Sequence, residues 1–342
     1  MMNDERKVKS SFFNSSFIIP HSYFLMRLFH GTDNAEIQRP TVLTLGVFDG
    51  LHLGHALIMR TVFERARALG AVPTAITFDP HPRAVLHPAS APPLLQTFDQ
   101  KIEAFGVLGI EQSIVIRFDE GFAQIRAEDF LRDVVRDRLQ AKEVYLGRGF
   151  AFGRGREGNI ELLKAASGRL GFHADEVPEV RLRGRRISSS RIREMLTAGH
   201  VNLARRMLGR PYGVEGRVVR GDERGRTLGF PTANLQPQNR VIPQRGVYVT
   251  ATLIDGAWRR SVTNIGTRPT FTRDDEPSVE TYVMDWQGDL YGDVLRVRFL
   301  HRLRAERKFA SVAGLKTQLD RDVARAAGYF ARGGVRRSLT IS

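Results

Sequence analysis

The 342-residue sequence contains no cysteine. This absence excludes disulfide bonds, thiol catalysis, iron–sulfur clusters and zinc sites of the cysteine type. It fits a protein of the reducing cytoplasm, and we expect a cytoplasmic location. The sequence also lacks an apolar run approaching the roughly 20 residues that a membrane-spanning helix needs, so we do not expect an integral membrane protein.

Lysine is scarce although the chain is basic. Lysine and arginine together number 52 against 37 acidic residues, a formal net charge of +15, yet only seven of the basic residues are lysine. The planar guanidinium of arginine is well suited to phosphate. The composition therefore indicates a phosphate-containing partner, which is either a nucleic acid or a small nucleotide.

The length predicts two domains at about 100–200 residues per domain. Residues 1–25 are rich in Ser, Phe and Lys, show no periodicity and have no signal-peptide cleavage site, so we expect a disordered extension. The Gly and Pro of residues 208–211 mark a boundary, which divides the rest into residues 26–209 and 210–342.

The first domain alternates short apolar runs with helical patterns. Strands are predicted at 41–48, 72–78, 113–118 and 143–146, and helices at 56–69 and 127–139. This alternation predicts a parallel sheet covered by helices, which binds ligands beyond the carboxyl ends of its strands. The second domain has short runs with turn signals at 213–219, 246–254, 258–265, 279–285 and 294–300, typical of an antiparallel barrel or sandwich, and then a helix at 310–329.

Residues 46–55, G-V-F-D-G-L-H-L-G-H, leave a predicted strand, turn at Gly50 and open a helix. His52 and His55 are three apart and project from one face of the first helical turn. That turn offers free N–H groups to an anion, Gly54 leaves room for a phosphate, and imidazole N–H groups can stabilise charge on a phosphoryl oxygen. The alternative is a pair of ordinary surface histidines. His81 and His87 show no metal-site spacing with them.

Two further segments carry phosphate-binding chemistry. Residues 187–193, I-S-S-S-R-I-R, place serines at the start of a helix, where they can cap it and offer hydroxyls to an anion beside arginines. Residues 221–234, G-D-E-R-G-R-T-L-G-F-P-T-A-N, form a Gly/Arg-rich loop that lacks the lysine of a Walker loop. Thr232 and Asn234 fall on one side of a strand and offer hard oxygen ligands for Mg²⁺. Solvated arginines around a helix cap, and a plain surface hairpin, are the alternatives.

These segments resemble, in order, those of the bacterial bifunctional riboflavin kinase/FMN adenylyltransferase (FAD synthetase) family. The resemblance runs from about Leu43 to Asp322 and includes Thr77–Pro82, the loop Leu146–Asn159, Asn264–Thr270, Val279–Asp285 and Arg304–Phe309. It implies an α/β Rossmann-like nucleotidyltransferase domain followed by an all-β antiparallel barrel of the riboflavin kinase type with a terminal helix. It also implies ATP as co-substrate, Mg²⁺ as cofactor, and riboflavin and FMN as the other substrates.

The resemblance assigns site residues to each reaction. His52 and His55 are the expected catalytic groups of adenylyl transfer and Glu280 the expected catalytic base of the kinase, accepting the proton of the riboflavin hydroxyl. The residues implied for ATP and phosphate in the first domain are Gly46, Phe48, Asp49, Gly54, Arg186, Ser189, Ser190 and Arg193, and those implied beside the flavin there are Phe150, Phe152 and Arg156. The residues implied in the kinase are Gly225, Arg226, Gly229, Thr232 and Asn234 at the nucleotide, with Thr232 and Asn234 on the metal, and Arg304 and Phe309 beside the flavin.

One position departs from the family pattern. Gly149 stands where the family carries Asn or Asp, which leaves open a riboflavin kinase with an impaired adenylyltransferase. A basic nucleic-acid-binding protein on a nucleotidyltransferase scaffold is the alternative from another class, although the arginines are scattered and no RNP, KH or helix-turn-helix signature is present. A flavin-storing protein is a third alternative. We expect small-molecule substrates with no membrane and no specific nucleic acid as partner, and the sequence predicts no oligomeric state.

Overall fold

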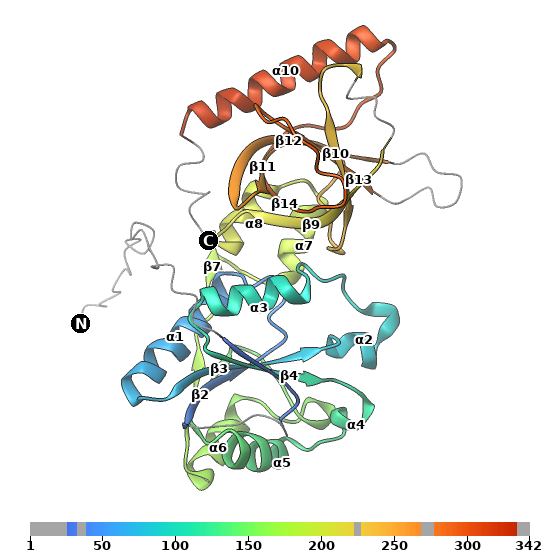
Figure 1. Ribbon diagram of the computed structural model, residues 1–342. Helices are drawn as coiled ribbons and strands as arrows, with labels where there is room; N and C mark the ends of the chain where they lie inside the picture. The colour runs from blue at the N-terminus through green and yellow to red at the C-terminus, as the bar shows by residue number, and fades with distance from the viewer. Residues whose placement is uncertain (1–25, 33–38, 222–226, 268–276, 334–342) are drawn as a thin grey trace, which may run out of the picture.

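The computed structural model in Figure 1 describes residues 26–32, 39–221, 227–267 and 277–333. The extension expected at residues 1–25 lies outside this part of the chain. A parallel α/β sheet forms the first half of the fold and a closed β-barrel the second. Both predicted fold classes are therefore confirmed.

The sheet of the first half has six parallel strands in the order β1-β4-β3-β2-β5-β6. Its strands are β1 (Arg27–His30), β2 (Thr41–Leu45), β3 (Val72–Asp79), β4 (Gln112–Arg117), β5 (Ala141–Gly147) and β6 (His173–Val177). The four predicted strands are β2 to β5, and the edge strands β1 and β6 come in addition. Strand β2 is shorter than predicted, because the chain turns at Phe48, whose φ is +51°.

Helices cover both faces of this sheet, so successive residues of its central strands enter different cores. Val42 packs with α1 (Leu53–Leu69) and α3 (Phe98–Val107) on one face, whereas Leu43 packs on the other face with α6 (Ile160–Leu170). In Figure 1, α3 lies on the side of the sheet that faces the barrel. The short helices are α2 (Pro82–Leu86), α4 (Glu120–Ala123) and α5 (Ala127–Asp129), with 3-10 turns at Pro88–Ser90 and Arg154–Arg156.

The helix predicted at 127–139 differs in its hydrogen bonding. One short α-helical turn, α5, leads into a π-helix over Phe130–Arg138. The spacing predicts that Phe130, Leu131, Val134 and Val135 face inward. Phe130, Leu131 and Val135 are buried, whereas Val134 is half-buried at the edge of the same core. Apolar spacing identifies the buried face but does not distinguish α-helical from π-helical bonding over so short a segment.

The barrel of the second half closes in the order β10-β13-β12-β11-β14-β9. Its strands are β9 (Tyr212–Val219), β10 (Thr232–Pro237), β11 (Gly246–Ile254), β12 (Ala257–Thr267), β13 (Pro277–Val283) and β14 (Val294–Arg304). The five predicted runs correspond to all of these except β10. Helix α10 (Val312–Ala331) lies across the barrel, as the final predicted helix requires.

The two halves share a hydrophobic core. A hairpin of β7 (Arg181–Leu182) and β8 (Arg185–Arg186) leads to α7 (Ser189–Thr197) and α8 (Val201–Leu208), which lie between sheet and barrel in Figure 1. Ile192 and Leu196 of α7 belong to the same buried cluster as Val214 and Leu235 of the barrel, and Leu95 joins it from the loop before α3. The barrel is therefore packed firmly against the elements that follow the carboxyl ends of the sheet strands.

Phe105 tests how much the α3 layer contributes to stability. Its side chain is fully buried between α3 and the sheet, and we expect Phe105→Ala to lower the free energy of unfolding by about 3–5 kcal/mol. Leu69→Ala on α1, at a side chain 47% exposed, is the matched control and should change it by less than about 0.5 kcal/mol. Urea unfolding followed by circular dichroism measures both, and equal effects would contradict the packing described here.

Candidate active sites

The two histidines of the first motif stack on each other at the start of α1. His52 is the N-cap residue, and its Nδ1 accepts a hydrogen bond from the backbone N–H of His55 at 3.3 Å. The ring centroids lie 3.7 Å apart with planes inclined by 13°. The predicted projection of both imidazoles from one face of the first helical turn is confirmed.

Burial keeps both imidazoles neutral. It lowers the pKa of His52 to about 4 and holds the pKa of His55 well below its ordinary value, with the neighbouring His52 and Arg186 acting in the same direction on His55. Because Nδ1 of His52 is an acceptor, its proton resides on Nε2. The Nδ1 of His55 is buried without a hydrogen-bond partner among the described residues. The pair can donate hydrogen bonds to an anion at neutral pH without adding charge.

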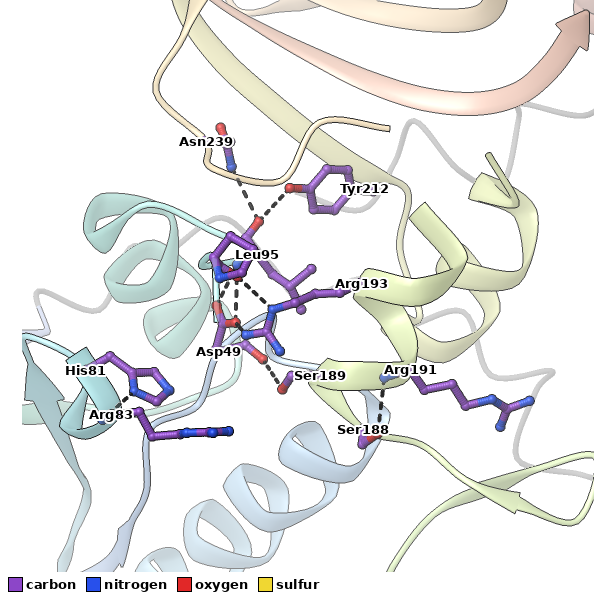
Figure 2. Close-up of polar contacts among 11 residues, drawn as sticks. Asp49, His81, Arg83, Leu95, Ser188, Ser189, Arg191, Arg193, Tyr212 and Asn239 are labelled. Carbon is purple, nitrogen blue, oxygen red and sulfur yellow. Dashed lines mark hydrogen bonds and ion pairs between the residues drawn. The ribbon is translucent and has the colours of Figure 1, made fainter. Parts of the chain in front are cut away.

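The serine segment lies beside this loop, at the N-terminus of α7. Ser188 caps the helix, since its Oγ accepts from the N–H of Arg191 at 3.3 Å. Ser189 donates its hydroxyl to the carbonyl oxygen of Asp49 at 2.8 Å, which links α7 to the histidine loop (Figure 2). Ser190 is exposed beside them. The predicted capping by serine is confirmed, and the structure brings the two motifs together across 140 residues of chain.

Asp49 is a buried carboxylate at the centre of this region. It is 4% exposed, forms an ion pair with Arg193 and accepts hydrogen bonds from the N–H of Leu95 at 2.9 and 3.2 Å. Arg193 also donates through Nε to the carbonyl oxygen of Pro93 at 2.6 Å. Burial raises the pKa of Asp49, and Arg193 opposes that shift. Arg193 is thereby fixed in one orientation.

Two titratable groups that the sequence did not assign to this site, Lys101 and His81, lie in the same region. Lys101 of α3 is buried, and its Nζ lies 3.4 Å from the hydroxyl of Thr77 at the end of β3. Burial lowers the pKa of Lys101, while Asp49 and Asp79 act to raise it. Burial also lowers the pKa of His81 to about 4, with Arg193 and Lys101 acting in the same direction. Nothing in the sequence pattern distinguished Lys101 from an ordinary helix residue. His81, in contrast, lies within Thr77–Pro82, one of the segments that resemble the family.

The other residues expected in the first site surround this centre. The ring of Phe48 packs against Gly46, where a Cβ would lie 2.9 Å from it. The ring of His52 packs against Gly54, where a Cβ would lie 3.1 Å from it. Arg186 donates to the carbonyl oxygen of Arg148 at 2.9 Å, and its Nη1 lies 3.8 Å from the position that a Cβ on Gly149 would occupy. A side chain at position 149 would therefore lie next to the guanidinium of Arg186.

The aromatic residues of the expected flavin-side loop have different environments. Phe152 is 7% exposed and its ring packs against Phe130 in the core. Phe150 is half-buried at the edge of the same cluster, and Arg156 is exposed. Their roles beside a flavin stay predictions.

The residues expected in the second site form a row across three barrel strands. Glu280 of β13 lies directly opposite Asn234 of β10 on one side and Asn264 of β12 on the other. Directly opposed residues of antiparallel strands point to the same face. This face is the outer surface of the barrel. Tyr282, two residues from Glu280, and Val262, two residues from Asn264, pack with α10, whereas Val279 points into the barrel core.

Aromatic groups flank this row. Thr232 lies opposite Tyr282, whose ring meets Phe230 edge-on at 5.3 Å between centroids. Lys316 of α10 lies 6.0 Å from the Phe230 ring. Gly229 is described and has a φ of +87°, whereas Gly225 and Arg226 lie outside the described residues.

The residues around Asn234 suit a hard divalent cation such as Mg²⁺. Amide and hydroxyl oxygens come from Asn234 and Thr232, which are ligand types that suit Mg²⁺ alongside phosphate oxygens. A Cβ on Gly221 would lie 2.3 Å from Nδ2 of Asn234, so only glycine allows this close approach. Among the described residues, no group of three or more His, Asp or Glu side chains has the arrangement of a protein-only metal centre.

Arg304 and Phe309 lie at the junction of β14 and α10. Arg304 pairs with Asp322 of α10, which is 1% exposed and also accepts from Gln318 at 2.8 Å. The ring of Phe309 lies near the guanidinium groups of Arg304 and Arg307, at 5.8 and 4.7 Å. Sequence reasoning missed Asp322, which anchors the segment leading to Phe309 onto the helix.

A parallel α/β sheet with paired histidines at one loop, joined to a closed barrel with a second polar row, is the arrangement expected of a two-domain phosphate-handling enzyme. Residues 34–191 match the family model described as FAD synthetase, and residues 208–330 match the one described as riboflavin kinase. The chain belongs to the family of bifunctional riboflavin kinase/FMN adenylyltransferases.

Relatives with that name match along most of the chain. The protein of Pseudomonas fluorescens is 37% identical over 88% of this chain and 97% of its own length. The Escherichia coli K12 protein is 36% identical over 90% of this chain and 97% of its own, and the Bacillus subtilis protein 35% over 86% and 94%.

One solved structure is similar over nearly the whole chain. A crystal structure described as a macrolide-efflux protein from Streptococcus pneumoniae has a TM-score of 0.80 and 29% identity, over 89% of this chain and 99% of its own. Among the residues described for the present chain, none of the helices has the length and apolar character needed to cross a membrane.

The neutral His52 predicts a pH dependence of stability. Its folded pKa of about 4 lies below the ordinary 6.5, so below pH 6.5 the unfolded state binds a proton that the folded state does not. The free energy of unfolding should therefore fall by about 2–3 kcal/mol through this group as pH drops from about 6.5 to about 4. Urea unfolding at several pH values measures the slope, which should be shallower in His52→Gln. An unchanged slope in that variant would show that His52 is not buried in its neutral form.

Proposed function

We propose that this chain makes FAD in two steps at two separate sites. The barrel transfers the γ-phosphoryl group of ATP to riboflavin, giving FMN and ADP. The α/β domain then joins FMN to the AMP portion of a second ATP and releases pyrophosphate. The observation that carries the proposal is that the stacked histidines with Arg193, and the row around Glu280, both occur in a chain that matches both family models.

For adenylyl transfer, a phosphate oxygen of FMN attacks the α-phosphorus of ATP and the bond to pyrophosphate breaks. His52 and His55 donate hydrogen bonds to the phosphoryl oxygens on which charge develops. The N-terminus of α7, with Ser189, Ser190 and Arg193, holds the departing phosphates. Gly46, Phe48, Asp49, Gly54 and Arg186 belong to the ATP and phosphate side, and Phe150, Phe152 and Arg156 to the flavin side.

For the kinase step, the primary hydroxyl of riboflavin attacks the γ-phosphorus of ATP. Glu280 accepts the hydroxyl proton as the new bond forms. Thr232 and Asn234 would hold Mg²⁺, which supplies charge neutralisation for the nucleotide phosphates. Gly225, Arg226 and Gly229 belong to the nucleotide loop, and Arg304 and Phe309 border the flavin.

We also propose the division into domains at residues 209 and 210 and a cytoplasmic location. The boundary is supported by the start of the riboflavin kinase match at residue 208. The location is supported by the absence of cysteine, which suits a reducing compartment.

Chromatography of flavins after incubation with riboflavin, ATP and Mg²⁺ tests the whole proposal. FMN should form first and FAD after it. FMN alone would favour the kinase with an adenylyltransferase impaired by Gly149. No conversion, together with tight salt-sensitive RNA binding, would overturn the enzyme proposal in favour of the nucleic-acid-binding alternative.

Glu280→Gln tests the kinase assignment. Loss of the base should lower the rate of FMN formation by about 100-fold or more, while conversion of supplied FMN to FAD stays within twofold of wild type. Separate assays with riboflavin and with FMN as substrate measure the two rates. Loss of both activities in folded protein would contradict the assignment of Glu280 to one site.

His55→Ala tests the adenylyltransferase assignment in the opposite direction. FAD formation from FMN should fall by about 100-fold or more because a hydrogen-bond donor to the transition state is lost. Phosphorylation of riboflavin by the same preparation should be unaffected and serves as the internal control for folding. A variant that keeps full adenylyltransferase activity would remove His55 from the mechanism.

A further inference from the structure

The backbone of Leu95 connects the barrel to the adenylyltransferase site. On one side its N–H donates to the carboxylate of Asp49 at 2.9 and 3.2 Å. On the other side its carbonyl oxygen lies 2.8 Å from the hydroxyl of Tyr212 and 3.4 Å from Nδ2 of Asn239 (Figure 2). The same hydroxyl lies 2.7 Å from the carbonyl oxygen of Val241, so its one proton is shared between the two carbonyl oxygens. Tyr212 and Asn239 belong to the barrel half of the chain, so a single peptide segment is held from both halves.

Asp49 connects the Leu95 segment to the residues proposed to bind phosphate. Its carboxylate pairs with Arg193, and its carbonyl oxygen accepts the hydroxyl of Ser189 at 2.8 Å. The side chain of Leu95 also packs against Gly50, whose φ of +82° and close contact leave no room for a Cβ. A shift of the Leu95 segment would therefore displace Asp49 and the groups that it orients.

Arg210 makes a second connection of the same kind. Its guanidinium donates to the carbonyl oxygen of Leu51 at 2.9 Å and to that of Gly50 at 3.0 Å, immediately before His52. Burial lowers the pKa of Arg210 to about 10, so the group stays charged at neutral pH. The ordered side chain fixes the turn from which the histidine pair begins.

Asn239 and the acidic residues around it make this contact extensive. Asn239 also donates to Oε1 of Gln100 on α3 at 2.9 Å, and its Oδ1 accepts from the N–H of Glu215 at 2.9 Å. Arg296 of β14 bridges Glu103 of α3 and Glu215 of β9, at 2.9 and 3.0 Å. The barrel is thus attached to α3 beside the Leu95 segment as well as through it.

We propose that the barrel completes the adenylyltransferase site, with Tyr212, Asn239 and Arg210 as positioning residues for adenylyl transfer. None of the three is a catalytic residue in our scheme. Each acts through the backbone of Leu95, Gly50 or Leu51 on Asp49, Arg193 and the histidine pair. The inference rests on the proposed function, because it requires that these groups bind ATP and FMN in the first site.

The chemistry of the contact favours a functional role over packing alone. Tyr212 is buried, and burial raises the pKa of its hydroxyl, which stays protonated and able to donate. Tyr212→Phe keeps the buried ring and removes only the hydroxyl, whereas a displacement of about 1 Å at a reacting group can lower a rate by about 100-fold. The expected damage is therefore larger in FAD formation than in folding.

Tyr212→Phe in the full chain is the first test, with Tyr291→Phe at an exposed barrel tyrosine as matched control. We expect kcat/KM for ATP in FMN-to-FAD conversion to fall by about tenfold, mainly through KM, while riboflavin phosphorylation stays within twofold of wild type. Arg210→Met should have the same selectivity, and Arg210→Lys should recover part of the loss. Equal loss of both activities, or no loss of either, would overturn the proposal.

A double-variant comparison separates positioning from general structure. If Tyr212 acts through Arg193, the loss of kcat/KM caused by Tyr212→Phe should largely vanish in an Arg193→Lys background. If Tyr212→Phe lowers kcat/KM by the same factor in both backgrounds, the proposed route is overturned. Absence of FAD formation by the wild-type protein would instead indicate failure of the proposed function, which the same assay detects independently of any variant.

Discussion

The buried ion pair of Asp49 and Arg193 is the interaction on which the first site depends. A carboxylate that is 4% exposed is stable only when its charge is matched, and here Arg193 and the N–H of Leu95 match it. The pair joins the loop after β2 to the second turn of α7, through residues that are 144 positions apart. It therefore assembles the histidine motif and the serine motif into one site. The histidines, serines and arginine would otherwise belong to separate surfaces.

The first site combines cationic and neutral groups. Arg186 and Lys101 place positive charge near His55, while His52 and His55 themselves are neutral. Positive charge attracts a triphosphate, and neutral imidazoles add directed hydrogen bonds without repelling the surrounding guanidinium groups. Part of the net charge of +15 is thus explained by phosphate chemistry. Some of the remaining arginines form exposed pairs, such as Arg132 with Asp133, which contribute little to stability.

The features of the first site that the sequence predicted depend on residues close together in the chain. The stacked histidines and the Ser188 cap were predictable, because a helical turn brings residues three apart onto one face. The contacts of Leu95 with Tyr212 and of Arg304 with Asp322 were not, because no local pattern marks which distant groups will meet. Edge strand β6 was missed for a different reason, since its sequence H-A-D-E-V lacks the apolar run of a central strand. Strand β10 has no apolar run of its own, because one of its faces carries the polar residues of the second site, and the sequence indicated a strand there only through Thr232 and Asn234.

Both proposed sites must position polar groups around phosphate, and they do so with different backbone arrangements. In the parallel sheet, strands end together at one edge, and helix N-termini supply N–H groups there to an anion. A closed antiparallel barrel has no such edge, so its polar groups must line up across neighbouring strands, as Asn234, Glu280 and Asn264 do. The row needs only adjacent strand register, whereas the first site needs distant loops to be held together. This difference explains why the contacts between the halves, through Leu95 and Arg210, converge on the first site.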